Sequence, residues 1–142
     1  MGFDSFKNKV VVVSGAASGI GNAICRKFAR EGARIGLLDM DAKGVQAASD
    51  KLRASGVDAV GLRCDVIDDN DCTSALTDSI GLYGGIDVLV NHAGITQRRA
   101  FVETQISVYR RVRDVQFFGS LHCTKAAMTS LIERKGSIIV IE

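Results

Sequence analysis

A run of four valines, Val10 to Val13, leads directly into the glycine-rich segment 15–21. An uninterrupted β-branched run of this kind predicts a strand that is buried on both faces. The residues from Ile20 to Glu31 predict a helix, which Gly32 ends. A buried strand that turns so tightly into a helix restricts the chain to folds in which helices pack back onto a sheet.

Further short apolar runs alternate with helical segments along the rest of the chain. The predicted strands are residues 34–38, 59–63, 86–91 and 136–141, and the predicted helices are residues 42–55, 68 or 69 to about 82, and 107–134. This alternation favours a parallel α/β sheet with right-handed crossovers. Similarity to the doubly wound, Rossmann-type fold implies the strand order 3-2-1-4-5.

Length and composition predict one domain, residues 1–142, with an ordinary globular balance. A net charge of +2 is too small to indicate nucleic acid or a membrane surface as a partner. The four cysteines lack C-x-x-C spacing and only two histidines are present, so we expect no metal site and a reducing compartment. Without an apolar signal region or a membrane-length apolar run, the sequence predicts a cytoplasmic protein.

The final predicted strand, residues 136–141, raises a physical difficulty. A parallel strand this apolar requires cover on both faces, and an uncovered edge favours aggregation. Nothing after it in the sequence supplies that cover. We therefore expect the sequence to be part of a longer protein, truncated after the fifth strand.

The glycine segment has the spacing G-x-x-x-G-x-G and predicts a phosphate site. Gly15 permits a tight turn, Gly19 lets the backbone approach a pyrophosphate, and Gly21 lets the helix and the strand pack closely. Free N–H groups and the positive dipole at the helix start favour an anion. We predict cofactor contacts from the loop, namely from Gly15, Ser18, Gly19, Ile20 and Gly21. The alternative is a purely structural turn.

Asp39 follows the second predicted strand, 24 positions after Gly15 (39 − 15 = 24). That offset is near the roughly 20 residues expected for a carboxylate that binds the adenosine ribose. A carboxylate repels a 2′-phosphate, and no Lys or Arg lies in the glycine loop to attract one. The predicted cofactor is therefore NAD, with NADP disfavoured, and Met40 is included in the site. Asp39 as a solvated loop acid and Asp41 as a competitor remain alternatives.

Two further motifs close the third and fourth strands: Asp65-Val66 and Asn91-His92-Ala93-Gly94. Together with the loop at 14–21 and Asp39, these motifs make the chain resemble the short-chain dehydrogenase/reductase family. The resemblance covers essentially the whole chain, but only the first half, or slightly more, of a typical member.

The resemblance implies a role for each residue of these motifs. Asp65 would bind the adenine amine, and Val66 would flank the ring. Asn91 would stabilise the central strand, while Ala93 and Gly94 would pass close to the cofactor ribose. The resemblance also implies that the full-length protein is a homo-oligomer. Its implied reaction is hydride transfer between NAD(P) and an alcohol or carbonyl substrate.

Two departures from the family pattern affect catalysis. Gln116 stands where the family usually has an Asn on the long helix. The family's Ser and Tyr-x-x-x-Lys are not among residues 1–142, because position 87 after Tyr83 is Asp and position 113 after Tyr109 is Arg. We therefore predict no catalytic residue in this chain and no turnover by the chain alone. The alternatives are a non-catalytic dinucleotide-binding or heterodimerising protein, and an inactive fragment.

Overall fold

The structure, a computed structural model, describes residues 5–95 and 98–141. Its centre is a five-stranded parallel sheet in the order β3-β2-β1-β4-β5. The strands are β1 (Val10–Ser14), β2 (Arg34–Asp39), β3 (Ala59–Arg63), β4 (Val88–Asn91) and β5 (Ser137–Val140). The predicted fold class and strand order are confirmed.

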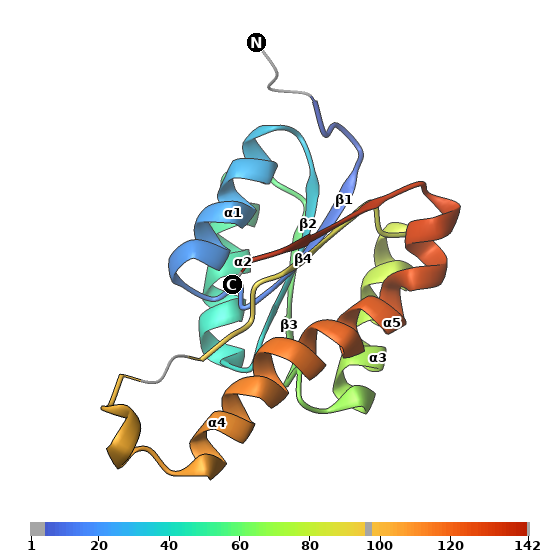
Figure 1. Cartoon of the computed structure of the whole chain (residues 1–142). Coiled ribbons are helices and arrows are strands. Elements are labelled where there is room, and N and C mark those ends of the chain that lie inside the picture. Colours follow the sequence, from blue (N-terminus) through green and yellow to red (C-terminus); the bar gives the residue numbers. More distant parts are fainter. Residues whose placement is uncertain (1–4, 96–97, 142) are drawn as a thin grey trace.

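Helices cover both faces of the sheet (Figure 1). One face packs against α1 (Gly19–Arg30) and α2 (Ala42–Ala54), and the other packs against α3 (Asp69–Tyr83) and α5 (Gly119–Glu133). A short 3-10 turn (Phe101–Glu103) and α4 (Ile106–Arg113) precede a π-helical turn (Asp114–Phe118) that runs into α5. This three-layer arrangement brings the carboxyl ends of all five strands to one edge.

The valine run explains why β1 lies at the centre of the sheet. Val10 and Val12 point into the apolar cluster beneath α3 and α5, whereas Val11 and Val13 point into the cluster beneath α1 and α2. All four are completely buried. A strand with an apolar side chain on both faces can sit only between two helical layers.

The helix boundaries agree with their capping residues. The Asp41 carboxylate accepts a hydrogen bond from the N–H of Gly44 at the start of α2, and Asp68 accepts from the N–H groups of Asn70 and Asp71 at the start of α3. Asp68 is therefore the cap of α3, one of the two candidates predicted. Gly32 follows α1 with φ of +91°, a conformation that L side chains rarely adopt.

The long predicted helix 107–134 differs from the observed structure at its middle. The chain forms α4, a π-helical turn and α5 in succession rather than one regular helix. Gly119 begins α5 immediately beside the loop after β3, where an added Cβ would lie 2.7 Å from Cγ2 of Val66. Apolar periodicity could not reveal this contact, because the partner is more than fifty residues away in the chain.

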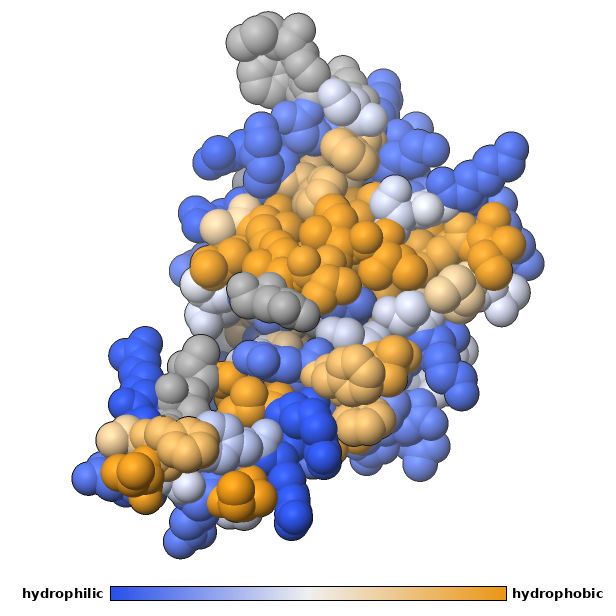
Figure 2. Space-filling view, viewed as in Figure 1, coloured by the Kyte–Doolittle hydropathy of each residue, from blue (hydrophilic) through white to orange (hydrophobic). Residues whose placement is uncertain are grey.

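β5 forms one edge of the sheet, and its side chains are exposed, with Val140 at 53% of its full accessibility. Figure 2 shows a broad apolar area across the middle of the molecule, where Figure 1 draws β5. Within the described ranges, none of the helices has the length and apolar character needed to cross a bilayer.

Candidate functional site

A pocket of about 140 Å³ opens at the carboxyl ends of the strands. Several of the predicted site residues line it: Gly15, Asp39, Met40, Asp65, Val66, Ala93 and Gly94. Ser18, Gly19, Ile20, Gly21 and Asn91 do not line it. Because ligand sites are usually 300–1,000 Å³, this pocket is large enough for only one portion of a dinucleotide.

The glycine loop has the geometry that its spacing predicts. Gly15 has φ of +68°, and a Cβ there would lie 2.9 Å from Cα of Ala93. A Cβ on Gly21 would lie 1.9 Å from the carbonyl oxygen of Gly15. Gly19 has φ of +59° but nothing within 4 Å of an added Cβ. The outer two glycines therefore close the turn, whereas Gly19 faces open space.

The start of α1 differs from the starts of α2 and α3 in having no side-chain cap. Ser18 occupies the cap position, but its hydroxyl makes no capping hydrogen bond, and the first turn contains no acidic residue. The first N–H groups of a helix have no partner within the helix. At α1 they lie beside the exposed residues Ser18, Gly19 and Ile20 and can donate to an anion.

Asp39 lies at the end of β2 with its carboxylate fixed by the backbone. One oxygen, Oδ2, accepts from the N–H of Ala17 at 2.9 Å, and Oδ1 accepts from the N–H of Asp41 at 2.9 Å. The carboxylate thus ties the glycine loop to β2 while lining the pocket. Each oxygen has a second lone pair that can accept a further hydrogen bond.

Ser14, the last residue of β1, positions the loop after β4 and was not among the predicted site residues. Its hydroxyl oxygen accepts from the N–H groups of His92 and Ala93, both at 3.1 Å. The hydroxyl also lies 3.5 Å from the carbonyl oxygen of Val90. Ser14 therefore links two strand ends across the sheet, which sequence order alone does not reveal.

Asp65 and Val66 form one wall of the pocket and are held from two sides. Oδ1 of Asp65 accepts from the N–H of Ile67 at 3.1 Å. The carbonyl oxygen of Val66 lies 2.7 Å from Nδ1 of His122 on α5. Val66 is 7% exposed, and it packs against Gly119. The segment is consequently anchored to α5 before any ligand arrives.

Asn91 and His92 serve the sheet and the loop rather than the pocket. Asn91 is 3% exposed, and its Nδ2 donates to Oγ1 of Thr124 at 3.0 Å. Its backbone oxygen accepts from the N–H of Ile141. His92 packs against the glycine loop, with Cδ2 3.0 Å from where a Cβ on Gly21 would lie. Asn91 thus supports the sheet through Thr124 and Ile141 and does not line the pocket.

The segment around the π-helical turn supplies residues to the site that sequence analysis did not identify. Arg111 and Val115, one helical turn apart, line the pocket together with Asp39. Gln116 donates from Nε2 to the carbonyl oxygen of Ile95 at 3.0 Å, and its backbone carbonyl accepts from the hydroxyl of Ser120. The only signal for Arg111 in the sequence was a loose cluster of arginines.

Three buried thiols lie next to the pocket in a row. Sγ of Cys72 lies 3.9 Å from Sγ of Cys64 and 3.8 Å from Sγ of Cys123. The hydrogen bond with Cys72, together with burial, raises the pKa of Cys64 well above its ordinary value. The hydrogen bond with Cys123 raises the pKa of Cys72 to about 12, with burial adding to it. Cys64 and Cys72 therefore stay protonated and do not act as nucleophiles at neutral pH.

Neither tyrosine is in a position to act at the strand ends. Tyr83 ends α3 near the start of β3, and its hydroxyl donates to Oδ1 of Asp58 at 3.1 Å. Burial and the Asp58 charge raise the pKa of Tyr83. Tyr109 lies on α4 against Phe101, with ring centroids 5.8 Å apart. The pocket therefore has binding groups but no aromatic proton donor among its lining residues.

Comparison with known proteins agrees with the family resemblance seen in the sequence. The sequence profile of the short chain dehydrogenase family matches residues 9–142. The chain is 34% identical to dehydrogenase/reductase SDR family member 7B of Bos taurus, over 95% of the chain and 44% of that protein. It is 35% identical to the L-fucose dehydrogenase of Oryctolagus cuniculus, over 96% of the chain and 47% of that protein.

The meso-2,3-butanediol dehydrogenase of Serratia marcescens is also 35% identical, over 94% of the chain and 53% of that protein. The chain thus spans about half the length of the curated relatives it matches. The family profile, the parallel sheet and the glycine loop agree, and the chain belongs to the short-chain dehydrogenase family.

Proposed function

We propose that residues 1–142 form the nucleotide-binding part of an oxidoreductase that transfers a hydride between NAD(P) and an alcohol or carbonyl substrate. The observation that carries the proposal is the uncapped start of α1, where Gly19 faces open space. The relatives include an L-fucose dehydrogenase and a meso-2,3-butanediol dehydrogenase, which supports the same reaction class.

The residues present fit a dinucleotide from its adenine to its second ribose. The first N–H groups of α1 would hold the pyrophosphate, and the spare lone pairs of Asp39 would accept from the adenosine ribose hydroxyls. Asp65 and Val66 would hold the adenine in the pocket. The backbone of Ala93 and Gly94 would lie beside the second ribose. The hydrogen bond from the N–H of Ala93 to the Ser14 hydroxyl holds this backbone in place.

When bound, the nicotinamide ring supplies the hydride chemistry, and the protein supplies orientation and acid–base groups. The two pocket carboxylates, of Asp39 and Asp65, already accept backbone hydrogen bonds and are assigned here to the ribose and the adenine. Neither tyrosine of the chain lines the pocket. We therefore propose that the proton donor lies outside residues 1–142 and that the chain alone binds the nucleotide without turnover.

The choice between NAD and NADP depends on two opposite charges that line the pocket. The Asp39 carboxylate would repel a 2′-phosphate, whereas the Arg111 guanidinium would attract one. Asp39 is held by two backbone hydrogen bonds, but Arg111 is an exposed side chain that must lose rotamer freedom to bind. The fixed charge favours NAD.

A second function, nucleotide binding without catalysis, is supported by Gln116. Its side-chain Nε2 donates to the carbonyl oxygen of Ile95. A side-chain nitrogen bound to this loop has one donor fewer with which to hold a water for a proton relay. In this reading, the whole protein would use the nucleotide for stability or for partner binding.

Thermal unfolding with NADH and with NADPH tests the binding proposal directly. We expect NADH to raise the melting temperature more than NADPH does, and Arg111→Gln to leave that order unchanged. Stabilisation by NADPH alone would contradict the NAD assignment. To test the catalytic part, Gln116→Asn can be compared with the wild type in the whole protein, where a rise in kcat would favour the enzyme over the non-catalytic alternative.

A further inference from the structure

A second recess lies away from the cofactor pocket, between α1 and α2. Its volume is about 480 Å³, against about 140 Å³ at the strand ends. The two share no lining residue. A volume of this size falls within the 300–1,000 Å³ typical of ligand sites. Any ligand of this recess is therefore additional to the dinucleotide.

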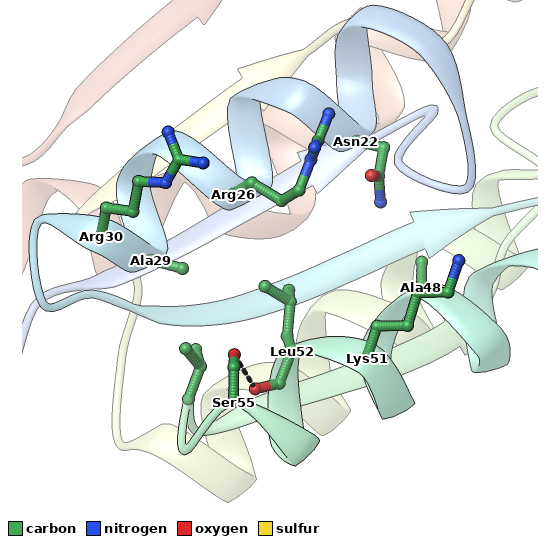
Figure 3. Close-up of a pocket in the computed structure, with 9 residues that line it drawn as sticks. Asn22, Arg26, Ala29, Arg30, Ala48, Lys51, Leu52 and Ser55 are labelled. Carbon is green, nitrogen blue, oxygen red and sulfur yellow. Dashed lines mark hydrogen bonds between the residues drawn. The ribbon is translucent and has the colours of Figure 1, made fainter.

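The floor of the recess is apolar. Ala29 on α1, Ala48 and Leu52 on α2, and Val57 line it. Figure 3 shows Leu52 reaching from α2 toward α1. Ala48 and Leu52 are 6% and 7% exposed, so the apolar surface is recessed. The short side chains of Ala29 and Ala48 leave space between the helices that longer side chains would fill.

The rim of the recess carries positive charge alone. Arg26 and Arg30 lie one turn apart on α1, and Lys51 lies on α2 (Figure 3). Among the described residues, none of these three cations forms an ion pair, and no carboxylate lines the recess. The neighbouring carboxylates are already used, since Glu31 pairs with Lys27 and Asp50 pairs with Arg53.

Like charges one turn apart destabilise a helix, and long cationic side chains cover apolar surface while their heads stay in water. A ligand with an anionic head and an apolar chain would match this recess. Its head would offset the repulsion between the cations at the rim, and its chain would cover the apolar floor. We propose that the recess between α1 and α2 binds a free fatty carboxylate, with its chain on Ala29, Ala48 and Leu52 and its head at Arg26 and Arg30.

Two other occupants fit the recess less well. A partner helix lying along α1 from Asn22 to Arg30 would need a length of about 12 Å. With a diameter of about 10 Å, such a helix occupies roughly 900 Å³, which is about twice the volume of the recess. A bilayer surface requires apolar side chains that project outward, whereas Ala48 and Leu52 are buried. An extended aliphatic chain is narrow enough to lie along the floor.

The test is a titration of the isotopically labelled 142-residue chain with dodecanoate below its micelle concentration, followed by amide shifts in ¹H–¹⁵N spectra. We expect saturable shifts at Ala29, Ala48 and Leu52. The double substitution Arg26→Gln with Arg30→Gln should weaken binding about tenfold. The matched control, Lys43→Gln with Lys125→Gln, removes two exposed lysines outside the recess and should leave binding unchanged.

A second variant, Ala29→Leu, fills the groove and keeps the three cations, so it should abolish binding while circular dichroism reports a folded chain. Dodecanol, which lacks the charge, should bind about tenfold more weakly than dodecanoate. The proposal would be overturned if the arginine double variant and the lysine control variant weakened dodecanoate binding equally. Shifts confined to β5, or binding to phosphatidylserine vesicles without any binding of dodecanoate, would also overturn it.

Discussion

Substitution of Gly19 by alanine separates the nucleotide-binding role of the glycine loop from its role in the fold. The residue has φ of +59°, and nothing lies within 4 Å of an added Cβ. A methyl group there meets no protein atom, so the cost to stability is that of the left-handed backbone alone, about 1–2 kcal/mol. For a chain of this size, that cost lowers the melting temperature by about 3–8 °C.

The same methyl group occupies the space through which the backbone would approach a pyrophosphate. Loss of one charge-assisted hydrogen bond costs about 2 kcal/mol, which is about a 30-fold rise in the dissociation constant. Isothermal titration of NADH into the wild-type chain and into the Gly19→Ala chain measures that ratio. Gly19 thus combines a small effect on folding with a large effect on binding.

Gly56 provides a matched control at the end of α2. It has φ of +88° and, like Gly19, nothing within 4 Å of an added Cβ. Gly56→Ala should lower the melting temperature by a similar amount and leave NADH binding unchanged. If both variants lose NADH binding equally, or if neither does, the glycine loop does not seat the cofactor by close approach of its backbone.

Three further substitutions or conditions test the contacts that hold the site and the core. Ser14→Ala leaves two backbone N–H groups after β4 without their acceptor, so we expect the unfolding free energy measured in urea to fall by about 2 kcal/mol. Ser14→Thr keeps the hydroxyl and should keep the wild-type unfolding free energy. An equal fall in both variants would contradict the role of the hydroxyl. Asp87 accepts from the N–H of Val10 at 2.8 Å and from Arg134 at 3.2 Å, so Asp87→Ala should cost about 3 kcal/mol; a loss no larger than that of a surface Asp→Ala would refute this. Burial raises the pKa of Cys25 from 9.0 to about 12. The buried, protonated thiol therefore contributes fully to the unfolding free energy below pH 9, and this contribution is lost as the pH rises toward 12. The unfolding free energy should fall over that interval in the wild type and fall less in Cys25→Ala, and identical slopes would show that another group is responsible.

The parts of the fold that could be predicted are those governed by local pattern. Val10 to Val13 could be assigned to a central strand because both faces of that strand are apolar, and the glycine loop and Asp39 could be assigned because their spacing follows from the strand–turn–helix geometry. The predicted ends of the helices differ from the observed ends by only one or two residues.

The contacts that could not be predicted join residues distant in the chain. Ser14 accepts from a loop 78 residues away, and Gln116 donates to a carbonyl 21 residues away. The π-helical turn has no distinct apolar period, so it reads as a continuous helix in the sequence. Arg111 on α4 lines the pocket beside residues of β2 and of the loops after β3 and β4, a long-range placement that composition cannot show.

The most direct test of the central claim is a ¹H–¹⁵N spectrum of the chain recorded with increasing NADH. The account predicts saturable shifts at the amides of Gly19 and Ile20, where the pyrophosphate would accept hydrogen bonds, and at Val66, where the adenine would lie. Spectra that do not change with NADH or NADPH, or that change only at amides far from the strand ends, would contradict it.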